Sequence, residues 1–257
     1  MLEARALGKK YGGVRALEDV SFTIRPGEVM GYLGPNGSGK STTVGMLTGL
    51  LHPTRGQVLF EGANILDDLV AYKRRLGYVP EVPQLYPYLS GREYLQLTTR
   101  LRGLASKSTD ARIDELLQLL GLGASRHSRI ASYSKGMRQK VLIAAALLHN
   151  PDVLVFDEPL SGLDVTTALV FRDLVQALAR EGKVILYSSH VLEVVEKVCS
   201  HVIILHKGRI VANDTVKNLR GLMDLPSLEE IFTQVVEQEN PANVASNIVE
   251  VMKGSRS

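Results

Sequence analysis

Continuous runs of apolar residues that end in glycine or in charged residues are the most regular pattern along this chain. Three such runs cover residues 27–34, 152–159 and 183–190. Uninterrupted apolar runs are typical of strands that are covered on both faces, as in a parallel sheet. The first run leads through a glycine-rich turn into the helical stretch 40–51. This order of strand, turn and helix predicts the start of a parallel α/β unit.

Shorter segments predict additional elements around this unit. Residues 56–62 have a strand pattern bounded by glycines and, together with residues 21–24, indicate a small antiparallel sheet. Residues 201–214 are typical of a hairpin that turns at Lys207–Gly208. A helix is predicted from about residue 164 to residue 180, directly after the second apolar run.

Between about residues 86 and 150 the pattern becomes helical, which indicates a helical block inserted into the α/β chain. Ser90 and Glu93 have the spacing of a capping box at the start of one helix. We expect Asp110 to cap the next helix and Gly121 to end it. The apolar face of that helix follows the helical period and consists of Ile113, Leu116, Leu117 and Leu120.

After Arg220 the character of the chain changes. The segment 226–238 is amphipathic and begins with a second capping-box pattern, formed by Ser227 and Glu230. The pair Asn240–Pro241 breaks the pattern. We therefore predict a short helical tail over residues 222–257 rather than a second domain.

Composition narrows the classes of protein that this chain can belong to. It has 257 residues, of which 45% are apolar and 22% charged, as in ordinary globular proteins. A net charge of +3 is too small to argue for nucleic-acid binding. Cys199 is the only cysteine, so no internal disulfide can form, as expected in a reducing compartment. No segment approaches the roughly 20 apolar residues that cross a bilayer, and the N-terminus lacks the pattern of a signal peptide. We expect the chain to stay in the cytosol unless a partner holds it at a membrane.

Residues 34–41, with the sequence GPNGSGKS, match the phosphate-binding pattern GxxxxGK[ST]. The glycines allow successive backbone N–H groups to converge on an anion. Lys40 supplies a mobile positive charge, Ser41 is placed to ligate Mg²⁺, and the dipole of the following helix points to the same place. A plain glycine turn is the alternative. The strand before the loop and the helix after it favour a bound triphosphate.

Asp157 and Glu158 end the second apolar run, where an unpaired buried charge is costly. A phosphate loop needs a carboxylate near its metal ion. If this strand is the neighbour of the strand before the phosphate loop, Asp157 arrives near Ser41. Glu158 then points toward the γ-phosphate, where a carboxylate can polarise an attacking water. In the alternative, Asp157 caps a loop and Glu158 is solvated.

The stretch Ser132–Lys140, with the sequence SYSKGMRQK, resembles the signature motif of ABC (ATP-binding cassette) ATPases in the variant form YSKGM. Other positions match further motifs of this family, in the order in which the family has them. Tyr11 matches the aromatic residue that stacks on adenine, Ser161–Asp164 match the D-loop, and His190 matches the switch histidine. Outside this context, Tyr11 is an ordinary surface aromatic, His190 a hydrogen-bonded polar residue and Asp164 a helix cap.

The resemblance covers about residues 2–220 and implies ATP and Mg²⁺ as ligands. It also implies a head-to-tail pair, in which each ATP lies between the phosphate loop of one cassette and the signature motif of a second ABC ATPase subunit. The nucleotide-binding positions that it implies are Tyr11, Gly34, Pro35, Asn36, Gly37, Ser38, Gly39, Lys40, Ser41, Thr42, Glu81, Ser134, Lys135, Gly136, Met137 and Asp164. The implied catalytic residues are Lys40, Glu158 and His190, and the implied metal ligands are Ser41, Glu81 and Asp157.

One position departs from the family pattern, because Glu81 stands where the Q-loop usually has glutamine. Gln84 lies three residues later and does not take its place. A carboxylate can meet Mg²⁺, but it cannot donate a hydrogen bond as an amide does. An acidic residue here and the segment SLEEIF in the tail resemble the cassettes that serve ABC-2 type exporters.

We therefore predict an α/β fold with a P-loop (RecA-like), mostly parallel sheet core, a small antiparallel β subdomain and a helical subdomain at about residues 86–150. Residues 1–221 form the predicted ATPase domain. The resemblance implies an ATPase that powers transport through a separate integral-membrane permease, at the inner face of the cell membrane. No nucleic-acid partner is expected.

Three alternatives remain at this point. The first is a soluble ABC ATPase that acts on DNA or ribosomes. The second is an ATP sensor without turnover, against which the intact Glu158 argues. The third is a small-molecule kinase, which would leave the signature motif without a role.

Overall fold

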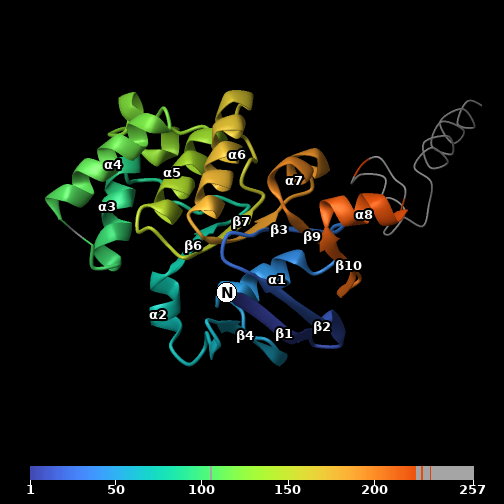
Figure 1. Cartoon of the computed structure of the whole chain (residues 1–257). Helices are drawn as coiled ribbons and strands as arrows, with labels where there is room; N and C mark the ends of the chain where they lie inside the picture. Colours follow the sequence, from blue (N-terminus) through green and yellow to red (C-terminus); the bar gives the residue numbers. More distant parts are fainter. Residues whose placement is uncertain (105, 224–226, 228–231, 233–257) are drawn as a thin grey trace, which may run out of the picture.

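Two sheets form the centre of the molecule in the computed structural model, which describes residues 1–104 and 106–223 together with Ser227 and Phe232 (Figure 1). The larger sheet has the strand order β10-β9-β3-β8-β7-β6, and all its strands except β10 are parallel. It consists of β3 (Val29–Leu33), β6 (Leu76–Val79), β7 (Val153–Asp157), β8 (Val184–Ser188), β9 (His201–His206) and β10 (Arg209–Thr215). The smaller sheet is antiparallel, in the order β2-β1-β4-β5, and consists of β1 (Leu2–Tyr11), β2 (Val14–Ile24), β4 (Arg55–Phe60) and β5 (Ala63–Asn64).

The strands predicted from continuous apolar runs are confirmed as β3, β7 and β8, whose residues are all buried. The small antiparallel sheet and the hairpin of β9 and β10 are also confirmed. The condition that β3 and β7 are direct neighbours is not met, because β8 lies between them and pairs in parallel with both. The order of parallel strands depends on how their crossover connections pack, which a local sequence pattern does not determine.

Helices cover the larger sheet on both faces. In chain order they are α1 (Lys40–Leu47), α2 (Leu69–Arg74), α3 (Gly91–Leu101), α4 (Lys107–Leu119), α5 (Lys135–Leu147), α6 (Val165–Arg180), α7 (Leu192–Val198) and α8 (Val216–Met223). Short 3₁₀ turns at Gly123–Ser125 and Ile130–Ser132 lead from α4 to α5. No helix in the described part of the chain is both long and apolar enough to cross a membrane.

Alternate side chains of each central strand enter two different cores. On β7, Val153 and Val155 pack with α1 and the smaller sheet, whereas Leu154 and Phe156 pack with α5 and α6. The ring of Phe156 meets that of Phe171 edge to face, with centroids 5.1 Å apart. Such a pair contributes about 0.5–1.5 kcal/mol beyond its buried area. Burial on both faces fixes the strand, and therefore the position of the two carboxylates at its end.

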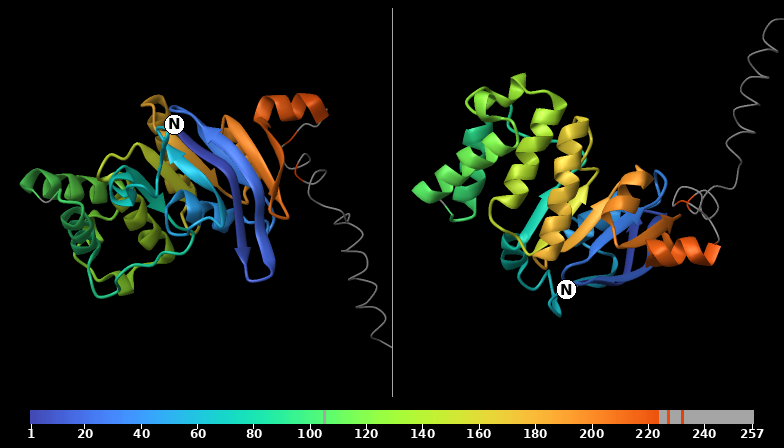
Figure 2. Two further views of the ribbon diagram at one scale, coloured as in Figure 1. Left: turned by 90° about the horizontal axis from the view of Figure 1, so that it is seen from below. Right: turned by 45° about the horizontal axis from the view of Figure 1, so that its top comes forward.

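The predicted helical block forms a third core of its own, at the end of the molecule opposite to α8 (Figure 2). Ile113 and Leu117 of α4 are completely buried there, as the helical period predicts. The expected cap of this helix was wrong. Ser106 caps α4, because its Oγ accepts a hydrogen bond from the backbone N–H of Thr109 at 3.1 Å. Asp110 lies in the first turn instead, and its Oδ1 accepts a bond from Nε2 of Gln96 at 2.8 Å.

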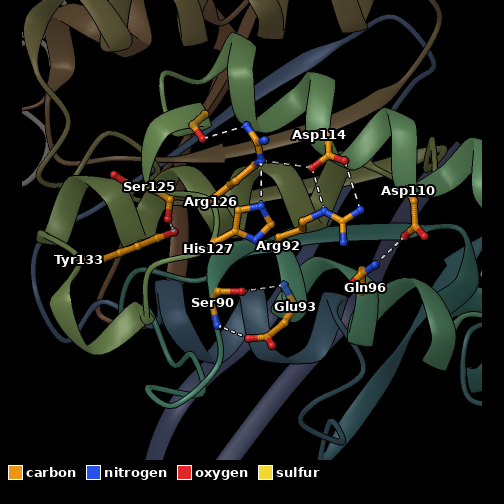
Figure 3. A network of polar contacts seen from close by, with 11 residues as sticks. Ser90, Arg92, Glu93, Gln96, Asp110, Asp114, Ser125, Arg126, His127 and Tyr133 are labelled. Atoms are coloured by element: carbon orange, nitrogen blue, oxygen red, sulfur yellow. Dashed lines mark hydrogen bonds and ion pairs between the residues drawn. The ribbon is translucent and has the colours of Figure 1, made fainter.

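Polar contacts join the helices of this block, as Figure 3 shows. The predicted capping box of α3 is confirmed, since Ser90 and Glu93 bond each other's backbone N–H groups. Arg92 of α3 forms two hydrogen bonds to the carboxylate of Asp114 of α4, at 2.8 and 3.2 Å. This guanidinium lowers the pKa of Asp114. Because the pair is partly exposed, it orients the two helices more than it stabilises them.

The predicted tail at residues 222–257 lies almost entirely outside the described residues. Helix α8 runs to Met223, two residues beyond the predicted domain boundary at residue 221. The capping box predicted for the tail needs Glu230, which is not among the described residues. The boundary therefore stays a prediction.

Candidate nucleotide site

The phosphate-loop sequence places the start of α1 at the end of β3. Gly39 precedes the helix at a φ of +108° and, as a glycine, has no side chain that could cap it. In the described structure no group accepts a hydrogen bond from the backbone N–H of Lys40, Ser41 or Thr42. Three free N–H groups at the positive end of a helix form a site for an anion such as a phosphate.

Gly39 is required here for a second reason. A Cβ atom at this position would lie 2.6 Å from Cδ2 of Leu17 and 2.8 Å from the carbonyl oxygen of Ala16. Strand β2 of the smaller sheet therefore packs directly against the loop. A side chain at residue 39 would push the loop away from the helix end that it precedes.

Lys40 turns its ammonium group back onto its own loop. Its Nζ donates hydrogen bonds to the carbonyl oxygens of Gly34, at 2.5 Å, and Pro35, at 3.1 Å. Burial lowers the pKa of Lys40, and the nearby carboxylates of Glu158, Asp157 and Glu81 oppose this effect. A cation bonded only to neutral carbonyl groups can exchange them for the stronger bonds that a phosphate oxygen offers.

A cavity of about 240 Å³ opens beside this loop. It is lined by Ala16, Asn36, Gly37, Gly39, Lys40, Ser41, Thr42, Glu81, Asp157, Glu158 and His190. The phosphate loop, the acidic end of β7, Glu81 and the segment after β8 therefore meet at one place, although they are far apart in the sequence. Ala16 was missed by the sequence reasoning, because an apolar residue in β2 carries no chemical signal.

The two carboxylates of the acidic strand differ in their surroundings. Asp157 is buried, and burial raises its pKa, to which the charges of Glu81 and Glu158 add. Glu158 adopts a φ of +48°, which is unusual for a residue other than glycine. Its backbone N–H donates to the carbonyl oxygen of Ser188 at 3.0 Å. This bond to β8 holds Glu158 in a strained turn whose side chain lines the cavity.

His190 contacts Glu158 directly. The Nδ1 atom of His190 lies 2.8 Å from Oε1 of Glu158, and Oγ of Ser189 donates to Oε2 of the same carboxylate at 3.4 Å. His190 and Ser189 both follow β8. Because β8 lies between β3 and β7, its end brings these two side chains next to the acidic end of β7. Ser189 was also missed by the sequence reasoning, although it directly precedes His190.

Several residues of the predicted site lie outside the cavity lining. Gly34, Pro35 and Ser38 belong to the loop behind it, where Ser38 is buried and its Oγ has no partner within the described structure. Tyr11 ends β1 and is 49% exposed, with Nζ of Lys9 lying 5.4 Å from its ring centroid. About half of this side chain is therefore open to solvent, outside the cavity itself.

The signature segment forms the start of α5, away from this cavity. Ser134 caps the helix, and its Oγ accepts a hydrogen bond from the N–H of Met137 at 3.2 Å. Lys135 and Gly136 occupy the first turn. Asp164 caps α6 in the same way, by accepting bonds from the N–H and the hydroxyl of Thr167. These bonds lower the pKa of Asp164 to about 2.

The donor atoms of the cavity fit Mg²⁺ only together with phosphate oxygens. The described residues include no group of three or more His, Cys, Asp or Glu side chains that could hold a metal alone. The hydroxyl of Ser41 and the carboxylates of Asp157 and Glu81 line the cavity as hard oxygen donors. Mg²⁺ is commonly held by one or two carboxylates, waters and the phosphates of a substrate.

A phosphate loop between a parallel strand and a helix, with a carboxylate pair ending another strand of the same sheet, defines a P-loop nucleoside triphosphatase. The chain belongs to the ABC transporter family, whose model matches residues 17–161. It is 41% identical to the ABC transporter ATP-binding protein NatA of Bacillus subtilis (strain 168), over 89% of this chain and 94% of NatA. It is 36% identical to the bacitracin transport ATP-binding protein BcrA of Bacillus licheniformis, over 82% of this chain and 68% of BcrA.

Solved structures agree with this assignment. An ATP-binding subunit of an ABC transporter superposes with a TM-score of 0.86 at 35% identity, covering 91% of this chain and 99% of that chain. The dimeric cassette MJ0796, in a post-hydrolysis state with ADP and Pi, gives a TM-score of 0.77 at 27% identity over 84% of this chain and 98% of that chain.

The predicted fold class and family are therefore confirmed, and the chain is an ATP-binding, ATP-hydrolysing subunit of an ABC transporter. These comparisons support a role in transport rather than the alternative role on DNA or ribosomes.

Proposed function

We propose that two cassettes close around ATP and thereby drive transport through a separate integral-membrane permease. The observation that carries this proposal is the separation of two anion-binding features within one chain. Among the described residues that line the cavity of the phosphate loop, none comes from residues 134–137 at the start of α5. This helix start is a second anion site that can serve the nucleotide of another cassette, and the dimeric structural relative supports such a pair.

Within the proposed pair, each matched residue has one task. Lys40 and the free N–H groups of the phosphate loop hold the phosphates, and Tyr11 stacks on the adenine. Ser134 and the first turn of α5 complete the shell of the γ-phosphate from the second chain. Ser41, Asp157 and Glu81 would hold Mg²⁺ together with the phosphates, and the ion would neutralise part of their charge.

Hydrolysis in this proposal uses Glu158 as the base. Its carboxylate accepts a proton from a water molecule, whose oxygen attacks the γ-phosphorus. The bond from that phosphorus to the bridging oxygen breaks, which leaves ADP and inorganic phosphate. His190 orients the carboxylate and the γ-phosphate. Loss of the γ-phosphate then removes the group that joins the two cassettes, so that they separate.

For the permease, we propose a docking groove between the larger sheet and the helical block. A cavity of about 300 Å³ lies there, lined by Thr48, Leu50, Lys73, Leu76, Tyr78, Tyr94, Thr98, Arg102, Leu142, Ala145 and Ala146. Exposed Tyr86 extends it, since its ring centroid lies 6.2 Å from that of Tyr94. Its mixed apolar and basic lining suits an amphipathic segment of a membrane protein, which would hold the chain at the inner face of the membrane.

Glu158→Gln tests the ATP sandwich. The amide cannot accept a proton, so we expect hydrolysis to fall about 100-fold or more. With Mg²⁺ and ATP the variant should elute as a stable dimer on gel filtration. Glu115→Gln, at an exposed position on α4, is the matched control and should behave as the parent chain. An unchanged rate in Glu158→Gln removes this residue from the mechanism, and a variant that stays monomeric with ATP contradicts the sandwich.

Leu50→Glu tests the docking groove. Leu50 is 64% exposed at the groove, and Leu119, which is 75% exposed on α4, offers a matched control. From detergent-solubilised membranes, the parent chain and Leu119→Glu should bring down a protein with several membrane spans, whereas Leu50→Glu should lose it. Equal recovery with both variants would place the contact elsewhere, and recovery of ribosomes or DNA would contradict the role in transport.

A further inference from the structure

The first residue of α5 contacts the segment that follows the acidic strand of the same chain. Nζ of Lys135 donates a hydrogen bond to Oγ of Ser161 at 2.7 Å. The backbone N–H of Ser161 in turn donates to the carbonyl oxygen of Glu158 at 3.1 Å. The backbone of Ser161 is therefore tied to the backbone of Glu158, the proposed catalytic residue of the same chain.

Three further contacts hold the start of α5 against the segment that follows β7. Nε2 of the buried Gln139 donates to the carbonyl oxygen of Pro159 at 3.1 Å. Nζ of Lys140 lies 3.7 Å from the carboxylate of Asp164. A Cβ atom on Gly136 would lie only 2.5 Å from the carbonyl oxygen of Gly162, so the two backbones are in direct contact. With the two segments held together, the exposed ammonium of Lys135 is the group that can change partners.

The Lys135 ammonium has an incomplete set of partners. Its side chain is exposed, and Ser161 offers one neutral hydroxyl. Within the described residues, no carboxylate forms an ion pair with Lys135, whereas neighbouring Lys140 pairs with Asp164. A phosphate oxygen would bind this ammonium more strongly than a hydroxyl does, because both groups are then charged. The Ser161 bond is therefore one that a triphosphate can displace.

We propose that Lys135 and Ser161 form a switch: Ser161 retains the ammonium while the cassette is alone, and the triphosphate of a second cassette takes it when the pair closes. This inference rests on the proposed ATP sandwich. Ser161 competes with ATP for Lys135 and is a positioning residue, which sets the ATP concentration at which two cassettes pair. Removing its hydroxyl frees the ammonium in advance and favours closure.

Ser161→Ala tests the switch through the ATP concentration at half-maximal hydrolysis. We expect this concentration to fall about fivefold, with kcat changed less than about twofold, since one exposed hydrogen bond to a charged group is lost. Ser161→Thr keeps the hydroxyl and should match the parent. Ser132→Ala should match it as well, because the Ser132 hydroxyl donates to the Arg129 carbonyl. Lys135→Met should raise the ATP concentration at half-maximal hydrolysis. In the Lys135→Met background, Ser161→Ala should leave that concentration unchanged.

A dimerisation assay distinguishes failure of the Lys135–Ser161 switch from failure of the ATP sandwich on which it rests. In the Glu158→Gln background, analytical ultracentrifugation should show Ser161→Ala pairing at a lower ATP concentration than Glu158→Gln alone. If Glu158→Gln dimerises but Ser161→Ala shifts neither the pairing nor the hydrolysis curve downward, the switch is wrong and the sandwich stands. A Ser161→Ala effect that persists in the Lys135→Met background also overturns the switch. If Glu158→Gln never dimerises with ATP, the sandwich itself fails.

Discussion

Nδ1 of His190 lies 2.8 Å from Oε1 of Glu158, although the two side chains differ greatly in exposure. The His190 side chain is 77% exposed and that of Glu158 is 13% exposed. An exposed ring is thus tied to a carboxylate at the base of the cavity. The proposed role of His190 follows from this arrangement: Nδ1 keeps Glu158 in place, and the exposed part of the ring is available to the γ-phosphate.

His190→Ala should reduce kcat by about 100-fold, because the Glu158 carboxylate then loses the group that orients it. The ATP concentration at half-maximal rate should change much less, since the phosphate loop is untouched. Steady-state ATP hydrolysis measures both quantities. His52→Ala, at an exposed position away from the cavity, is the control. A His190→Ala chain with the parent kcat would show that the 2.8 Å contact has no part in the reaction.

Asp157→Asn should stabilise the chain in the absence of nucleotide. Burial raises the pKa of Asp157 in the folded state above its ordinary value of 3.8. Between the ordinary pKa and the raised pKa of the folded state, the carboxyl of the unfolded chain has already lost its proton while that of the folded chain has not. Folding stability therefore decreases as the pH rises, until the folded carboxyl also ionises. The amide avoids that loss, and we expect a melting temperature about 2 °C higher at pH 7.5. The difference should narrow as the pH approaches 4.

Thermal unfolding at several pH values measures this effect. Asp67→Asn, which removes an exposed carboxylate outside the cavity, should leave the melting temperature unchanged. Adding Mg²⁺ and ATP should stabilise the parent more than Asp157→Asn, because the ionised carboxylate then has a cation nearby. A variant that is less stable than the parent at pH 7.5 without nucleotide would contradict the unfavourable burial of this charge.

The phosphate loop and the carboxylate pair could be predicted because each is contiguous in the sequence. A strand, a loop of fixed length and a helix start determine the free N–H groups of Lys40, Ser41 and Thr42 locally. The continuous burial of β7 likewise places Asp157 and Glu158 at a strand end. These features need no information about the remainder of the fold.

Other features depend on packing between distant segments and could not be predicted. The position of β8 between β3 and β7 follows from the way the crossover helices pack. The bond between Lys135 and Ser161 joins a helix start to a segment after another strand, and no local pattern indicates it. The predicted cap of α4 was wrong because serine and aspartate are equally good caps. Ser106 is the cap because its own backbone is extended, which a local pattern does not determine.

Glu81→Gln should retain ATPase activity. The Glu81 side chain lines the cavity with Asp157 and Glu158, so three carboxylates face the same space as Lys40. The amide keeps an oxygen that can meet Mg²⁺, adds a donor and removes one negative charge near the triphosphate. We therefore expect hydrolysis within about threefold of the parent rate and no increase in the ATP concentration at half-maximal rate, since an oxygen ligand is retained. Glu81→Ala loses that ligand and should be slower than Glu81→Gln. Gln84→Ala, outside the cavity lining, should match the parent. If Glu81→Gln is inactive while Gln84→Ala is not, this chain requires the carboxylate itself.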